Sequence, residues 1–437
     1  MKLFIRTAFI LIFLPLISLI LLFIYSLQDQ PLAPETADFF TSTPINLDKN
    51  FFIASSGIRA PSGETDFHAF GIKLFNGETK LTRSKRLEFE NDVVPEKTNC
   101  IKQTGHYTFR PPLKHKPAEC LSSDETELLL NRNQEILNRL EDLYIKTPDL
   151  NVNKGGRGHI RYASIIDVYN LHPMLCVKWK NQVQNSNGQK AIESWMNSTR
   201  AFKHIFQGQL NFNDYLQWEL TYLLNLFCLP TLFEADTSLI KIHGEEIIDL
   251  LDFDHLALWN LEKTLQTKGY FLNADEQTLK TQLKFFYAPN KVRNQLYKSS
   301  QDIIQLSKVA PHELDKAVGQ LKLKYPDCSL AKLHNCSIPE YFDERIYDFE
   351  HYAEAFFSSH RLNARQIATI LWIKAHMQNL PAEKMNDFLS AVPTKYHDPI
   401  NQKPFLWDSE KHSIYHVIQN YDGTHRQQDL IFYNPKP

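Results

Sequence analysis

The twenty residues from Thr7 to Ser26 are almost purely apolar, and this segment constrains the chain more than any other feature. A helix of twenty residues is about 30 Å long, which matches the hydrocarbon core of a bilayer. Lys2 and Arg6 precede the segment, and the next basic residue is Lys49. By the positive-inside rule, the N-terminus stays in the cytoplasm and the rest of the chain crosses the membrane. The sequence therefore predicts a transmembrane anchor at 7–26 that contacts membrane lipid.

A cleaved signal peptide is the alternative interpretation of this segment. Such a peptide has an apolar core of about 7–15 residues followed by small residues at the cleavage site. The run here is longer and ends in Phe23-Ile24-Tyr25-Ser26. Ala33, the nearest small residue in a suitable position, is followed by Pro34. The pattern favours an uncleaved anchor, with cleavage left as the alternative.

Charge and length bound the rest of the chain. The 48 basic and 50 acidic residues give a net charge of −2, so no basic surface for nucleic acid is indicated and no nucleic-acid partner is predicted. A chain of 437 residues has room for two or three folded units.

All six cysteines lie after the predicted anchor: Cys100, Cys120, Cys176, Cys228, Cys328 and Cys336. An even number of cysteines in an exported domain suggests disulfides. Nearest-neighbour pairing predicts Cys100–Cys120, Cys176–Cys228 and Cys328–Cys336, although the spacing leaves the connectivity open. Because Cys176 and Cys228 lie in apolar helical stretches, two buried free thiols are the alternative for that pair. A zinc site is not favoured, because the sequence has no C-x-x-C.

Helical periodicity dominates the middle of the chain. Ser122 and Glu125 have the spacing of a capping box. Apolar residues then recur at three- and four-residue steps, at Leu129, Ile136, Leu137, Leu140, Leu143 and Tyr144, and again at Leu216, Leu220, Leu223, Leu224 and Phe227. We expect the second helix to follow Asn213-Asp214 and to end at Pro230.

The predicted fold class is mainly α, with a small C-terminal β meander. Turn signals at Asp398-Pro399, Lys403-Pro404 and Asp422-Gly423 separate the strand-like runs 405–407 and 414–418. The predicted organisation is a cytoplasmic tail at 1–6, the anchor at 7–26, a linker at 27–50, a mainly helical domain at 51–380 and the β module at 381–437.

The C-terminal residues resemble the tail of the major pseudopilins of type II secretion. Asp398-Pro399, Lys403-Pro404-Phe405, Ile414-Tyr415 and Asp422-Gly423 follow the order of that tail, in which a "DP-x-G-x-P-x-x-Y" turn leads to a strand reading "x-x-I-Y-S-x-G-x-D-G". A similar tail after a long helical body occurs in uncharacterised single-pass envelope proteins of Gram-negative bacteria. The resemblance implies a bacterial inner-membrane protein whose main domain lies in the periplasm.

The resemblance has two further consequences. The N-terminus lacks the prepilin cleavage site of a pseudopilin, a Gly-Phe step with a glutamate five residues into the mature helix, so we do not expect assembly as a pilin subunit. Some pseudopilins bind calcium in the tail loop, and by position the ligands here would be Asp422 and Asp429. Calcium requires six to eight oxygen ligands, so a plain turn is the alternative for these two residues.

No motif for catalysis is present, since the sequence lacks H-E-x-x-H, G-x-S-x-G and a P-loop. We interpret two acidic clusters with a histidine, Glu340–His351 and Asp252–His255, as solvated acidic faces. The sequence thus predicts no catalytic residue and favours a non-catalytic role in binding a partner protein or in assembly at the cell envelope. A periplasmic hydrolase whose site assembles from distant residues and a membrane-anchored immunity protein against a periplasmic toxin are the alternatives.

Overall fold

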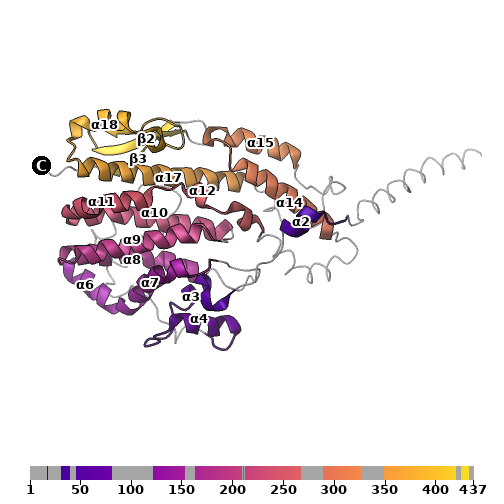
Figure 1. The fold of residues 1–437 in the computed structure, drawn as a ribbon, viewed down its shortest axis with the longest axis horizontal. Coiled ribbons are helices and arrows are strands. Elements are labelled where there is room, and N and C mark those ends of the chain that lie inside the picture. Colours follow the sequence, from indigo (N-terminus) through magenta and orange to yellow (C-terminus); the bar gives the residue numbers. More distant parts are fainter. Residues whose placement is uncertain are drawn as a thin grey trace, which may run out of the picture. The chain divides into compact units, whose positions relative to one another are not determined.

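The computed structural model describes residues 17, 31–39, 46–80, 122–152, 163–208, 210, 212–266, 289–325, 349–419 and 425–432. The chain divides into two compact units (Figure 1). Unit 1 comprises 1–42 and 265–354, and unit 2 comprises 43–264 and 355–437. The predicted anchor at 7–26 lies outside the described residues except for residue 17. Among the described helices, none is both long enough and apolar enough to cross a bilayer.

Unit 1 contains three described helices and the start of a fourth: α2 (Pro34–Phe39), α14 (Pro289–Leu306), α15 (Leu314–Lys324) and the first turn of α17 (Phe349–Met377). The helix α2 falls within the segment predicted to be a linker. It packs on α14, because Phe39 meets the ring of Tyr297 edge-on with centroids 5.2 Å apart. In addition, the side chain of Asn294 accepts from the backbone N–H of Ala33 at 3.0 Å.

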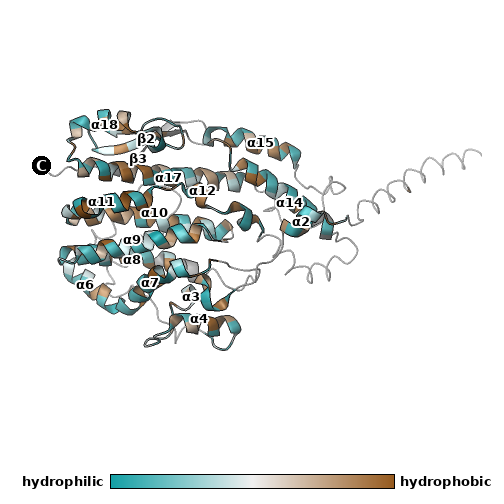
Figure 2. Ribbon diagram, viewed as in Figure 1, coloured by the Kyte–Doolittle hydropathy of each residue, from teal (hydrophilic) through white to brown (hydrophobic). Residues whose placement is uncertain are grey.

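Unit 2 is a stack of helices with a small sheet near its C-terminus. Its α-helices are α3 (Phe51–Ser56), α4 (Phe67–Asn76), α6 (Ser123–Arg132), α7 (Gln134–Lys146), α8 (Ala163–Gln184), α9 (Gly188–Phe206), α10 (Phe212–Ala235), α11 (Ser238–Leu251), α12 (His255–Leu258), the rest of α17, and α18 (Met385–Ala391). The helices α8, α9 and α10 pack on one another. Figure 2 shows hydrophobic and hydrophilic residues on each of them, as expected of amphipathic helices that share a core.

The mainly helical prediction is confirmed, and several of its details hold. Ser122 and Glu125 form the predicted capping box at the start of α6. The apolar residues predicted to lie on one face of α6 and α7 are all buried: Leu129, Ile136, Leu137, Leu140, Leu143 and Tyr144. The periodicity identified the buried residues correctly because α7 has a polar outer face and a single apolar face.

The helical prediction for α10 is confirmed, but its predicted bounds are wrong, because the helix begins at Phe212 and continues through Pro230 to Ala235. Of the apolar residues that predicted it, Leu224 is buried, whereas Leu216, Leu220, Leu223 and Phe227 are only partly buried. Its most deeply buried residues include Tyr215, Trp218, Glu219 and Tyr222. Proline removes one backbone hydrogen bond from the helix. In the same turn, the Thr231 hydroxyl donates to the carbonyl of Cys228 at 2.6 Å.

The C-terminal strands form an antiparallel sheet in the order β1 (Leu406–Asp408), β2 (Ser413–Gln419), β3 (His425–Phe432). This confirms the small C-terminal β element. The preceding Asp398-Pro399 turn is fixed by the carboxylate of Asp398, which accepts from the N–H of Ile400 at 3.0 Å. The same carboxylate lies 3.3 Å from Nδ1 of His416 on β2, and both side chains are buried.

A buried arginine binds the loop between α3 and α4 in the N-terminal part of unit 2. Arg139 of α7 is 6% exposed, and its guanidinium forms an ion pair with Glu135. The same group donates to the backbone carbonyls of Ile58, Ala60, Pro61 and Glu64 at 2.6–3.1 Å. The loop between α3 and α4 is therefore held on α7 by hydrogen bonds that use the fork of donors in the guanidinium.

The contact between α3 and α4 depends on two glycines. A Cβ atom placed on Gly71 would overlap the carbonyl of Ile53, and one on Gly57 would overlap the carbonyl of Phe67. Both obstacles are backbone atoms, which cannot move aside like the end of a long side chain.

We therefore predict that Gly71→Ala destabilises unit 2 by about 1–3 kcal/mol, although alanine has the higher helix propensity. All six tryptophans lie in unit 2, so the urea dependence of tryptophan fluorescence follows this unit alone. Lys73→Ala, at an exposed position of the same helix, is the control and should change stability by less than about 0.5 kcal/mol. Equal stability of the two variants would contradict the tight packing.

Candidate functional site

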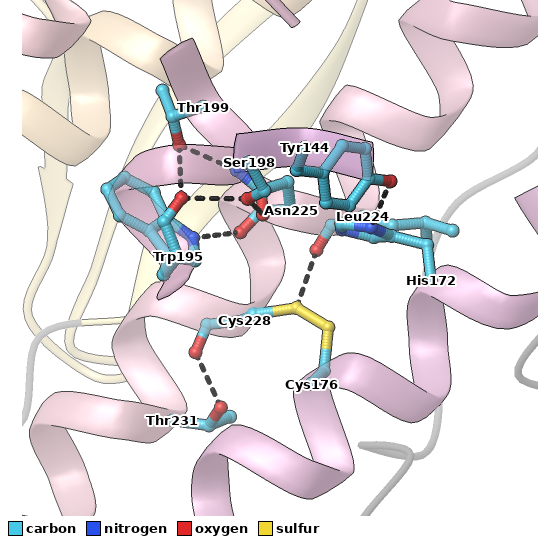
Figure 3. Close-up of a disulfide and its surroundings, with 10 residues drawn as sticks. All are labelled: Tyr144, His172, Cys176, Trp195, Ser198, Thr199, Leu224, Asn225, Cys228 and Thr231. Atoms are coloured by element: carbon cyan, nitrogen blue, oxygen red, sulfur yellow. Dashed lines mark hydrogen bonds between the residues drawn. A yellow bond between two sulfur atoms is a disulfide. The ribbon is translucent and has the colours of Figure 1, made fainter. Parts of the chain in front are cut away.

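A disulfide joins α8 and α10, the two longest helices that lie wholly within unit 2. Cys176 of α8 and Cys228 of α10 are bonded, with Cα atoms 5.4 Å apart (Figure 3). This confirms the predicted Cys176–Cys228 pair over the alternative of two free thiols. Both residues are buried. The other four cysteines, Cys100, Cys120, Cys328 and Cys336, lie outside the described residues.

A network of buried polar groups surrounds the α10 side of the disulfide (Figure 3). The Asn225 side chain accepts from the Ser198 hydroxyl at 2.7 Å and donates to the Thr199 hydroxyl at 2.8 Å. Its backbone carbonyl accepts from the indole N–H of Trp195 at 2.8 Å. Because each of these polar atoms is paired inside the core, the network fixes how α9 and α10 pack against each other.

His172 lies one turn before Cys176 on α8, beside the Asn225 network (Figure 3). Its Nδ1 atom is 3.0 Å from the hydroxyl of Tyr144, and the ring is fully buried. Burial disfavours the charged ring and lowers the pKa of His172 to about 3, so the imidazole is neutral near pH 7. One ring nitrogen of His172 and the two sulfur atoms lie within 4.8 Å of one another.

A second buried cluster centres on Glu219 of α10. The Ser359 hydroxyl of α17 is hydrogen-bonded to Oε1 of Glu219, to the hydroxyl of Tyr215 at 3.0 Å and to the carbonyl of Ala355 at 3.0 Å. His255 lies beside this carboxyl group, with Nε2 3.6 Å from Oε1. The side chains of Glu219 and His255 are 5% and 0% exposed, so this cluster is closed to solvent.

Burial outweighs hydrogen bonding in setting the protonation state of Glu219. The Ser359 hydroxyl donates to Oε1 of Glu219, and the hydroxyl groups of Ser359, Tyr215 and Ser358 all favour the charged carboxylate. Burial acts in the opposite direction and is the larger effect, so it raises the pKa of Glu219 to about 8 and keeps the group a carboxylic acid near neutral pH.

His255 is packed as an aromatic ring. Its centroid lies 3.9 Å from that of Phe206, edge-on, and its plane is nearly parallel to that of Tyr222 at 5.6 Å. Neither ring nitrogen has a hydrogen-bond partner among the described residues. Burial lowers the pKa of His255 to about 3, so the pair with Glu219 consists of a neutral ring and a neutral acid. The prediction that Asp252–His255 forms a solvated acidic face is thus wrong for His255, although Asp252 and Asp254 are exposed.

The structure places the remaining predicted residues as follows. Asp422 lies outside the described residues, and Asp429 lies on β3, where its backbone pairs with Tyr415. The calcium site therefore stays a prediction. From the cluster 340–351, residues 340–348 are outside the described part, whereas Glu350 pairs with Lys322.

The roles of Glu219, Ser359 and His172 were not predicted from the sequence. A signal for Glu219 was present, because it is the one acidic residue within the largely apolar stretch Tyr215–Phe227. Ser359 and His172 carry no such signal, since their roles depend on which helices meet. A scan against protein-family models and searches of the curated proteins and of the solved structures gave no match to this chain.

Proposed function

We propose that this chain is an anchored protein of the cell envelope. In this proposal, residues 7–26 span the inner membrane of a Gram-negative bacterium, and the folded part binds a partner protein in the periplasm without catalysing a reaction. The observation that carries the proposal is the Cys176–Cys228 disulfide in the core of unit 2. Disulfides form and persist in oxidising compartments and are rare in the reducing cytosol.

Two features together support export. The disulfide requires an oxidising compartment, and the apolar segment 7–26 provides the means to reach one. Each feature has an independent origin in the sequence, because the anchor depends on hydropathy and the disulfide on the meeting of α8 and α10.

The burial of the titratable clusters favours a binding role over catalysis. A catalytic acid, base or nucleophile must come within hydrogen-bond distance of a substrate. The Glu219 cluster is enclosed in the core, and His172 is fully buried. Their neutral side chains instead suit a role in holding the helices together.

The sheet offers a surface for a partner. Ile414 and His416 of β2 point into the fold, so the alternating residues Tyr415 and Val417 share the outward face. Leu406 on β1 is opposite Tyr415 and adds to the same face. Leu406 is 43% exposed and Val417 is 39% exposed, so apolar atoms of both residues are accessible on this face of the sheet.

Site-specific photo-crosslinking in the native membrane tests this surface. A photoreactive residue at Leu406 or Val417 should give a discrete adduct with a partner protein. The matched control is Ile242, an apolar residue of α11 that is 66% exposed in the same unit and should give no adduct. A secretion or pilus component in the adduct would support an assembly role, and a single toxin-like protein would favour immunity. Equal adducts at all three positions, or none under conditions that capture a known envelope complex, would contradict the proposal.

A further inference from the structure

Two cysteines and a histidine meet in the core of unit 2. His172 and Cys176 are four residues apart on α8, so their side chains lie on one face of that helix. Cys228 reaches the same place from α10 (Figure 3). One ligand atom from each of the three residues lies within 4.8 Å of the others. Two thiolates and an imidazole are the ligands that thiophilic cations prefer in proteins.

His172 has a ring nitrogen available for such a cation. Its Nδ1 atom is hydrogen-bonded to Tyr144, whereas Nε2 has no partner within hydrogen-bond distance among the described residues, although the ring is fully buried and the Asn225 side chain interacts with it. Buried polar atoms without partners are rare and often mark an ion or a functional group. A histidine that ligates a metal typically donates its other N–H to a neighbouring oxygen, which is the position that Tyr144 occupies.

We propose that the reduced forms of Cys176 and Cys228 bind a thiophilic d10 cation, Zn²⁺ or Cu(I), together with His172. The disulfide is then the oxidised, metal-free state of the same site. An external dithiol converts one state to the other, because it gives two electrons and two protons to the disulfide and becomes a disulfide itself. Metal binding displaces the two thiol protons. This proposal concerns a different property from partner binding and does not rest on it.

Charge and coordination separate the two cations. Two thiolates, a neutral imidazole and Zn²⁺ have no net charge, which suits a buried site. Zn²⁺ would need a fourth ligand such as water, whereas Cu(I) accepts the three protein ligands alone but leaves one negative charge. Competition with chelators of known affinity for each metal distinguishes these cases.

The experiment uses the full-length chain in detergent with Cys100, Cys120, Cys328 and Cys336 replaced by serine, so that one cysteine pair remains. The protein is reduced with a phosphine, which takes up the oxygen of water and leaves two thiols, and the phosphine is then removed. Zn²⁺ or Cu(I) is titrated against a chromophoric chelator, and Co²⁺ serves as a spectroscopic substitute for Zn²⁺. We expect one metal ion per chain, thiolate-to-cobalt charge-transfer bands, and no binding by the oxidised protein.

Variants of the ligand set decide the assignment. His172→Asn should weaken binding by at least about tenfold, and Tyr144→Phe, which keeps all three ligands, should weaken it by about tenfold through loss of the hydrogen bond to Nδ1. His243→Asn, at a buried histidine of α11 that binds Gln189, is the control and should bind like the parent. Circular dichroism confirms folding, and Tyr144→Phe provides the test if His172→Asn does not fold. No binding by the reduced parent, or binding that neither His172→Asn nor Tyr144→Phe weakens, would overturn the proposal.

Discussion

Glu219→Gln should stabilise unit 2 above neutral pH. The folded pKa of Glu219 is about 8, against 4.5 in a model peptide, so the native state keeps a proton that the unfolded chain has lost between these values. Folding stability therefore falls as pH rises from 4.5 to 8, by about 5 kcal/mol from this group alone. Glutamine preserves the shape and an oxygen that accepts from Ser359 but cannot ionise, so the loss should disappear.

Urea unfolding followed by tryptophan fluorescence between pH 4.5 and 8.5 measures the effect. The variant should match the parent at the acidic end of this range and exceed it by several kcal/mol at the alkaline end. Glu262→Gln, at an exposed position in the same unit, is the control and should follow the parent throughout. A variant that is less stable than the parent at pH 8 would show that Glu219 is ionised in the folded chain.

Substitution of Glu141, a carboxylate with a charged partner, should have the opposite effect to substitution of Glu219. Glu141 is partly buried, and its carboxylate accepts from Trp179, Ser194 and the ammonium group of Lys178. Glu141→Gln removes the ion pair with a partly buried lysine and should destabilise the same unit, because it leaves a charge without its partner. Opposite signs for Glu141→Gln and Glu219→Gln are the expected result.

Removal of the Cys176–Cys228 disulfide should produce a loss of similar size. The bond closes a loop with a sequence separation of 52 residues. In the chain-entropy model, a loop of this length corresponds to about 4 kcal/mol, through the restriction of the unfolded chain. The double variant Cys176→Ala/Cys228→Ala should therefore unfold at a clearly lower urea concentration.

The control uses chains in which the other four cysteines are serine. A reductant should lower the stability of the disulfide-bonded chain and leave the double alanine variant unchanged. If the double variant were as stable as the parent, the bond would not stabilise the fold, and its value as a sign of an oxidising compartment would be weakened.

The parts of the fold that the sequence predicted are those that depend on local pattern. Helix α7 has one apolar face and one polar face, so its buried residues followed from spacing. The Ser122–Glu125 capping box is likewise encoded within four residues. The C-terminal strands followed from their turn residues, of which Asp398 accepts from the N–H of Ile400, two residues later.

The parts that were missed depend on which helices meet. Helix α10 is covered on nearly all sides, so the periodicity of its leucines did not identify its innermost face. The partners of Glu219 include Ser359, which is 140 residues away in sequence, and His255. Similarly, Cys176 and Cys228 could be paired from the sequence, but the position of His172 beside them required the packing of α8 on α10.

The oxidation state of the Cys176–Cys228 pair in cells is the most direct test of export to an oxidising compartment. The full-length chain, with serine at the other four cysteines, is expressed in a Gram-negative host, and its thiols are trapped in acid and then labelled with a maleimide polymer. The account predicts no mass shift before reduction and two additions after it, whereas a chain without residues 1–26 should take up two additions without reduction. Free thiols in the full-length chain, or a disulfide that forms equally without the apolar segment, would contradict it.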